Sequence, residues 1–168
     1  MMIEFAILLL FPAAMAFAAA SDFITMTIPN RISIALVIGF VVLAPITGMA
    51  MTTVGIHVLT GFSVLVVCFG LFAFGYIGGG DAKLLAVCAL WMGWPGTMTF
   101  LIYTSLFGGV LALGLVSLRK FPLPAGLSRF DFIDRLHEEG GDAPYGIAIA
   151  AGALTTYPST FWMQALGA

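Results

Sequence analysis

Long runs of apolar residues make up most of the chain, and short polar or glycine-rich breaks separate them. Most of these runs approach the roughly 20 residues that an α-helix needs to cross a lipid bilayer. We therefore predict an all-α integral membrane protein, a single domain over residues 1–168 built as one bundle of about six transmembrane helices. The predicted spans are 3–20, 32–51, 54–76, a short fourth one at 83–94, 96–118 and 145–166.

Composition supports the membrane class and excludes others. Of the 168 residues, 61% are hydrophobic and only 8% are charged, and the mean hydropathy is +1.12. Such a chain has too little polar surface to coat a soluble globule. With six basic residues and no basic face, we expect no nucleic-acid partner. Cys68 and Cys88 lie inside apolar runs without a CxxC pairing, so packing is their expected role.

The basic residues predict the orientation of the bundle. If all six segments cross the membrane, every lysine and arginine falls on the same side, which the positive-inside rule makes cytoplasmic. Both termini would then lie outside. This agreement fails without the fourth segment, because the loop at 119–144 would move to the opposite face. The basic residues are Arg31, Lys83, Arg119, Lys120, Arg129 and Arg135.

Two aspartates stand beside breaks between apolar runs, Asp22 after the first and Asp81 before the fourth. Acids at the edge of a membrane span are rare, and they commonly mark function. A helix from Asp81 to Trp94 would measure about 21 Å. This is less than the ~30 Å hydrocarbon core, so with Trp91 and Trp94 in the outer interfacial belt, Asp81 would lie slightly below the cytoplasmic surface.

The glycines before Asp81 would let the chain break between two spans and present a carboxylate. A purely structural alternative remains open for each acid. Asp81 can serve as a helix N-cap with the glycines as a turn, and Asp22 as a turn residue beside Ser21.

Two carboxylates in one site do not both ionise easily, so such a pair holds a single proton near neutral pH. The ionised member can activate water, and the protonated one can polarise a carbonyl and protonate the leaving amine. This is peptide hydrolysis by an aspartic dyad without a cofactor. We expect no metal, since His57 lies in the other half of the membrane, His137 in a charged loop, and neither has HExxH spacing.

Three motifs, in order, resemble those of the type IV prepilin peptidases. Asp22 precedes Ile28-Pro29-Asn30, the run Gly78-Gly79-Gly80-Asp81 resembles the GxGD signature followed by Lys83, and Pro144-Tyr145-Gly146 opens the last span. The resemblance covers nearly the whole chain. It implies Asp22 and Asp81 as the catalytic pair, with support from Gly78, Gly80, Lys83, Pro29, Asn30, Tyr145 and Gly146.

The resemblance also implies a substrate and a location. The substrate would be a prepilin with a basic leader and a hydrophobic helix, cut at the cytoplasmic border of the bacterial inner membrane. Without an N-terminal methyltransferase region, the chain looks like the short, peptidase-only branch that serves Tad/Flp pili. The segment between Asp22 and Pro29 carries no charge, where many relatives have Arg or Lys.

The remaining residues leave several alternatives open. Lys83 either stabilises the ionised dyad or extends to the interface, and Tyr145 either lines the cavity or only begins a helix. The charged loop at 119–144 predicts a short amphipathic helix on the cytoplasmic surface, with Ser128 as its cap and Phe130 on its apolar side.

Two other functions compete with leader cleavage. A presenilin-like protease shares the GxGD feature but cuts within a span. A small transporter or channel subunit could use the two acids as an ion relay, although no inverted repeat relates the halves of the chain.

Overall fold

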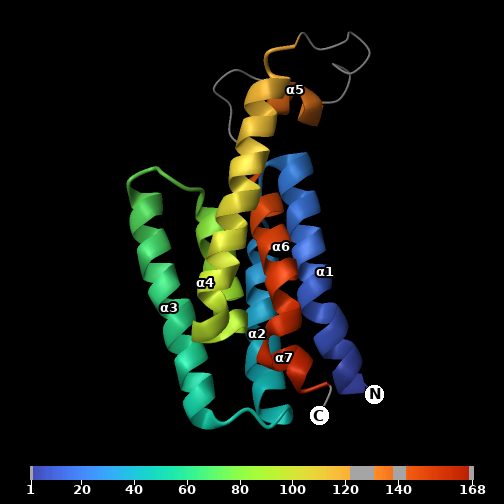
Figure 1. Cartoon of the computed structure of the whole chain (residues 1–168), viewed down its shortest axis with the longest axis vertical. Helices are drawn as coiled ribbons and strands as arrows, with labels where there is room; N and C mark the ends of the chain where they lie inside the picture. The colour runs from blue at the N-terminus through green and yellow to red at the C-terminus, as the bar shows by residue number, and fades with distance from the viewer. Residues whose placement is uncertain (1, 122–130, 138–142, 167–168) are drawn as a thin grey trace.

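The computed structural model of the chain describes residues 2–121, 131–137 and 143–166, and this part is helical, with no strand. The all-α prediction is confirmed for these residues. Figure 1 shows the helices packed side by side along one long axis. Their bounds are α1 Met2–Thr25, α2 Asn30–Ile46, α3 Met51–Ala73, α4 Gly79–Leu118, α5 Asp131–His137, α6 Tyr145–Thr156, the 3-10 turn η1 Tyr157–Ser159 and α7 Phe161–Gln164.

Two opposite ends of the bundle can be told apart in Figure 1. The start of α1 and the short α7 lie at one end, which we call the terminal end. The connections at 26–29 and 74–78 and helix α5 lie at the other, which we call the loop end. Because α1 and α4 reach the loop end with Asp22 and Asp81, the two acids gather there.

Helix α4 reverses direction at Gly93, which has non-helical backbone angles of φ 67° and ψ 177°. Thr97 Oγ1 lies 3.4 Å from the carbonyl of Ala89, although a straight helix would separate these residues by about 12 Å. Figure 1 shows the two arms of α4, residues 79–92 and 94–118, running in opposite directions. Pro95, which lacks a backbone N–H, follows the break. The predicted boundary between the fourth and fifth segments therefore falls at a real interruption.

Several predicted boundaries were wrong. Helix α1 continues to Thr25 instead of ending at residue 20, so Asp22 lies in its last turns and not in the break. The segment at 145–166 is not one helix, because α6 ends at Thr156 and η1 and α7 follow. The backbone of α1 stays helical past the polar residue Ser21. Hydropathy alone places the end of the span at such a residue.

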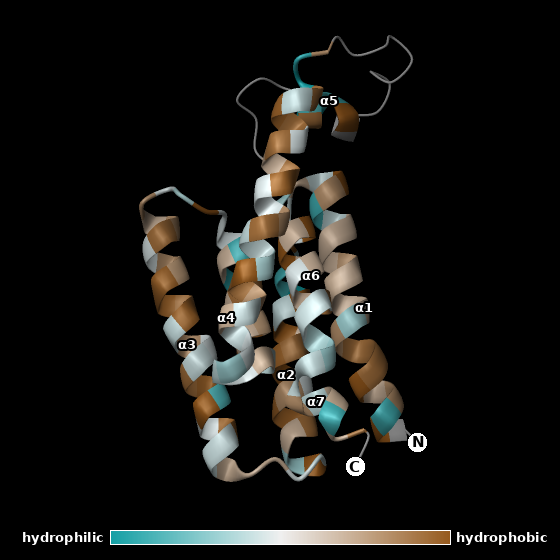
Figure 2. Ribbon diagram, viewed as in Figure 1, coloured by the Kyte–Doolittle hydropathy of each residue, from teal (hydrophilic) through white to brown (hydrophobic). Residues whose placement is uncertain are grey.

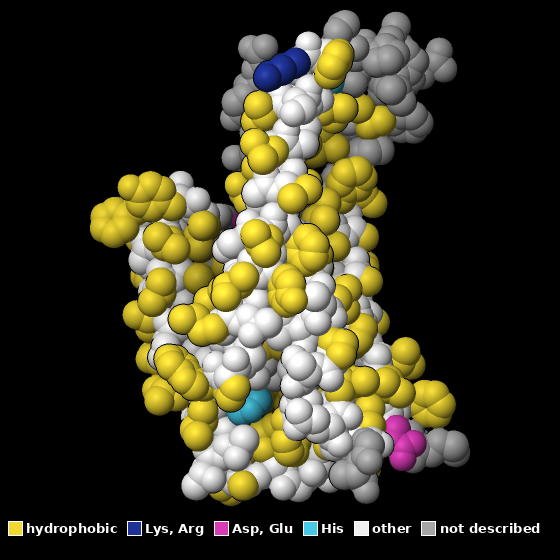
Figure 3. Space-filling view, viewed as in Figure 1, with side chains coloured by type: hydrophobic (Ala, Val, Ile, Leu, Met, Phe, Trp, Pro, Cys, Tyr) yellow, Lys and Arg dark blue, Asp and Glu magenta, His cyan; other side chains and the backbone are white. Residues whose placement is uncertain are grey.

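Three of the described helices are long and apolar enough to cross a membrane, namely Ile3–Thr25, Met51–Ala73 and Gly79–Leu118. Helix α2 is a shorter apolar helix. Figure 2 shows hydrophobic residues along the length of these helices, and Figure 3 shows the exposed flank covered by apolar side chains. This is the surface expected where lipid is the solvent.

An aromatic cluster fills the core toward the terminal end. The ring centroids of Trp91 and Trp162 are 4.6 Å apart, as are those of Phe11 and Tyr157. Their polar atoms are satisfied, since Trp91 Nε1 donates to the Leu36 carbonyl at 3.0 Å and Trp162 Nε1 to the Trp91 carbonyl at 2.8 Å. Trp91 is fully buried. Its expected place in an interfacial belt was therefore wrong, because its ring packs between helices, whereas Trp94 is 66% exposed.

The reversal of α4 should depend on glycine at position 93. A Cβ at this position would lie 2.5 Å from His57 Nε2, and the observed φ of 67° is strained for other residues. We expect Gly93→Ala to lower the free energy of unfolding by about 2 kcal/mol or more, measured by denaturation in detergent micelles.

Gly109→Ala is the matched control, because a Cβ at Gly109 meets no atom within 4 Å. Equal unfolding midpoints for Gly93→Ala and Gly109→Ala would show that the reversal does not require glycine.

Candidate active site

Asp22 is a buried carboxylate in the last turns of α1, with only 6% of its surface exposed. Its Oδ2 accepts a hydrogen bond from the backbone N–H of Gly146 at 2.7 Å. A buried charged group is costly unless such a donor replaces water. The bond joins the loop end of α1 to the first turn of α6, two segments far apart in the sequence.

Gly146 lies so close to Asp22 that no side chain fits there. A Cβ at this position would lie 2.8 Å from Oδ2, 2.9 Å from Cβ and 3.0 Å from Cγ of Asp22. Helix α6 begins at Tyr145 with Pro144 as its N-cap. The first N–H groups of a helix have no partner within it, so the Gly146 N–H is available to the carboxylate.

Asp81 lies in the first turn of α4, where the helix dipole favours a carboxylate. The N-cap of α4 is Gly78, which makes no side-chain cap hydrogen bond, so the alternative that Asp81 is the N-cap was wrong. The glycines allow close approach: a Cβ on Gly78 would lie 3.0 Å from Asp81 Oδ2, and one on Gly80 would lie 3.2 Å from Ile28 Cβ.

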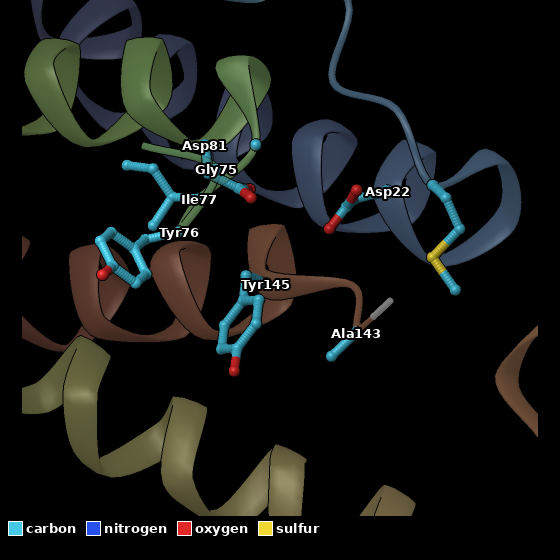
Figure 4. Close-up of a pocket in the computed structure, with 9 residues that line it drawn as sticks. Asp22, Gly75, Tyr76, Ile77, Asp81, Ala143 and Tyr145 are labelled. Atoms are coloured by element: carbon cyan, nitrogen blue, oxygen red, sulfur yellow. The ribbon is translucent and has the colours of Figure 1, made fainter. Parts of the chain in front are cut away.

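Both carboxylates line the same cavity. A cavity of about 330 Å³ is bounded by Asp22, Asp81, the connection at 74–78 and Tyr145. A neighbouring cavity of about 280 Å³ also contains both acids and extends over Thr27, Ile28 and the three glycines. Figure 4 shows the carboxylates of Asp22 and Asp81 pointing toward one another across the open space, with Tyr145 beside them. The two acids therefore border a cleft with room on both sides of the pair.

Sequence reasoning missed Met26, which lines both cavities. Its φ of +53° is unusual for a residue other than glycine. Its N–H donates to the carbonyl of Asp22 at 2.8 Å, and α1 ends at the preceding residue, Thr25. Thr25 Oγ1 and Thr27 Oγ1 are 2.7 Å apart, which ties the turn together. No glycine or asparagine in the sequence signalled this left-handed position.

The other predicted supporting residues fall into two groups. Tyr145 lines the larger cavity and Gly78 lines both, whereas Lys83, Pro29 and Asn30 line neither. Lys83 Nζ instead donates to Asn30 Oδ1 at 2.9 Å, on the exposed side of the junction between α2 and α4. Pro29 is the N-cap of α2. These three residues hold the connection at 26–29 in place beside the cleft.

Helix α5, Asp131–His137, lies at the loop end and within the segment where the sequence predicted a short amphipathic helix. Arg135 Nη2 donates to the Ile24 carbonyl at 2.8 Å, two residues after Asp22. Arg119 Nε donates to the Leu136 carbonyl at 2.9 Å, which links α5 to the end of α4. The predicted cap Ser128 and the apolar Phe130 lie outside the described residues.

Neither histidine and neither cysteine is among the residues that line the two cavities with the acids. Cys68 and Cys88 are buried and unbridged, and His57 Nδ1 contacts the Leu90 carbonyl at 2.8 Å near the terminal end. Within the described ranges, no three His, Cys, Asp or Glu side chains come together as metal ligands. Two facing carboxyl groups, as Asp22 and Asp81 present here, can serve as a general acid and a general base.

The chain was compared with known proteins. A model of the type IV leader peptidase family matches residues 9–113, which include both Asp22 and Asp81 but end before the Pro144-Tyr145-Gly146 segment. Neither a curated protein nor a solved structure gives a match. The family model covers more than half of the chain, and the chain belongs to the type IV leader peptidase family of proteases.

Proposed function

We propose that the protein is an aspartic endopeptidase that removes the leader of type IV prepilins at the cytoplasmic membrane border. The observation that carries this proposal is that Asp22 and Asp81, on two different helices, line one cleft. The family supports a leader peptidase in general, and the cleft supports these two acids as its catalytic pair.

The proposed reaction uses one proton on the carboxyl pair. The ionised carboxylate takes a proton from a water molecule, and the resulting hydroxyl attacks the scissile carbonyl carbon. The protonated carboxyl donates its proton to the carbonyl oxygen. When the tetrahedral intermediate collapses, the C–N bond breaks, the amine leaves with the proton that the first carboxylate took from water, and a hydroxyl of the intermediate returns its proton to the other carboxylate. No metal or covalent intermediate is required.

The position of the cleft indicates where on the protein a substrate would bind. It opens at the loop end, beside exposed apolar residues of the connection after α3, among them Phe74 at 81% and Tyr76 at 76% exposure. A substrate that keeps its hydrophobic helix in the membrane could therefore place the peptide just before that helix beside the acids.

The proposed topology has six crossings, with the two arms of α4 counted separately and with α6 together with η1 and α7 as the last crossing. The loop end would face the cytoplasm and the terminal end the outside of a bacterial inner membrane, because the basic residues that the structure describes lie toward the loop end. The terminal end carries Glu4 in the first turn of α1.

The position of the cleft also separates the proposal from its rivals. A presenilin-like protease cuts within a span, and an ion relay needs acids that connect both faces. Here both acids lie at one end of the bundle, which favours cleavage at the membrane border. The assignment to the Tad/Flp branch stays a prediction from the sequence.

Asp22→Asn and Asp81→Asn should each abolish cleavage of a co-expressed prepilin, because neither variant retains both an acid and a base. We expect a loss of at least about 10³-fold in kcat with normal membrane insertion, measured by immunoblot of leader removal.

Glu4→Gln is the matched control, since it neutralises an acid on α1 at the terminal end. Substantial processing by either aspartate variant would contradict the dyad. Proton-coupled flux in liposomes without proteolysis would favour the transporter.

The proposed orientation predicts the accessibility of two loop positions. In a chain with Cys68 and Cys88 replaced by alanine, a cysteine at Phe74, directly after α3, should react with an impermeant maleimide only from the cytoplasm. A cysteine at Ala50, directly before α3, should react only from outside. Both residues are exposed and have negative φ, which a cysteine can adopt. Labelling of both positions from one side would refute the topology.

A further inference from the structure

We propose that Gly146 is a positioning residue that assigns different tasks to the two oxygens of Asp22. Its N–H fixes Oδ2, so that Oδ1 is the oxygen that exchanges a proton during catalysis. This inference rests on the proposed function, and it concerns a contact between α6 and α1 that the matched family region does not include.

The chemistry of the contact supports the division of tasks. A backbone N–H only donates, so the oxygen facing it at 2.7 Å must accept and has no room for a proton directed at the nitrogen. Because a carboxyl oxygen that carries a proton is a poorer acceptor than one that does not, this contact favours Oδ1 of Asp22 and the carboxyl of Asp81 as the sites of the proton that the pair holds. A hydrogen bond to a charged acceptor is also short and strong, so it holds the plane of the carboxylate.

The absence of a side chain at position 146 supports the same inference. Gly146 lies within the regular helix α6, so its backbone needs no special freedom. The three atoms nearest to a Cβ at this position all belong to the Asp22 side chain. Because alanine has the higher helix propensity, any loss of stability in Gly146→Ala would come from the displaced carboxylate. Gly146→Ala is therefore a selective probe of the orientation of Asp22.

The first test measures the contact without any substrate. Gly146→Ala should lower the midpoint of thermal unfolding in detergent by about 4 °C or more, because its Cβ collides with Asp22. In an Asp22→Gly background, which lacks every atom of that collision, the same substitution should cause no decrease. Equal decreases in the two backgrounds would overturn the proposed contact.

The second test measures catalysis with purified enzyme and a prepilin. Gly146→Ala should reduce kcat about 100-fold while KM changes less than about twofold, because the misplaced group acts on the reacting atoms and not on substrate binding.

Gly152→Ala in the same helix is the structural control, because its Cβ would collide with Thr104 of α4 instead of with the acid. Gly152→Ala should lose stability but keep its kcat per folded molecule. Wild-type kcat in Gly146→Ala, or an equal loss of kcat in Gly152→Ala, would overturn the positioning role.

The two tests separate this inference from the proposed function. If the wild-type protein cleaves no prepilin, the proposed function fails, and the unfolding cycle still decides whether Gly146 holds Asp22. If the wild type cleaves and Gly146→Ala cleaves equally well, only the inference fails.

Discussion

A carboxylate inside so apolar a chain must be held by polar groups of the protein itself, and the bond from the Gly146 N–H to Asp22 meets this requirement. It joins the end of α1 to the first turn of α6, and it requires glycine at the contact. The end of α1 and the first turn of α4, which carry Asp22 and Asp81, line the same cavities. The cleft exists because two helix starts and one helix end meet at the same end of the bundle.

The reversal at Gly93 supports the same arrangement from the opposite end. A continuous helix over α4 would extend about 60 Å, twice the ~30 Å hydrocarbon core. The break instead returns the chain, and the second arm leads back to the loop end and α5. The aromatic cluster of Trp91, Tyr157 and Trp162 packs beside the reversal, with its N–H and O–H groups bonded to backbone carbonyls. The cleft that the two acids line therefore lies at the loop end, whereas the aromatic cluster lies toward the terminal end.

The sequence predicted the helical class, the acid pair and the glycines at the start of α4, because hydropathy and rare charges depend little on tertiary contacts. It placed the end of α1 wrongly, since helical hydrogen bonds continue through Ser21 and Asp22. The position of Trp91 in the sequence suited the interfacial belt of the membrane, but its side chain is buried between helices. The Lys83–Asn30 bond, the left-handed Met26 and the Gly146 contact depend on which helices become neighbours, and no local pattern contains that information. Tyr145, for which the sequence left two roles open, lines the larger cavity.

The central claim is that Asp22 and Asp81 act together on one scissile bond. Its most direct test is the Kd of a hydroxyethylene analogue of the prepilin cleavage site, whose hydroxyl stands where the attacked carbonyl would be. We expect tight binding to the wild type and a loss of about 100-fold or more in both Asp22→Ala and Asp81→Ala, because an analogue of the transition state needs both carboxyl groups. An unmodified, uncleaved leader peptide should bind all three proteins alike. Undiminished binding of the analogue to either variant would contradict the account.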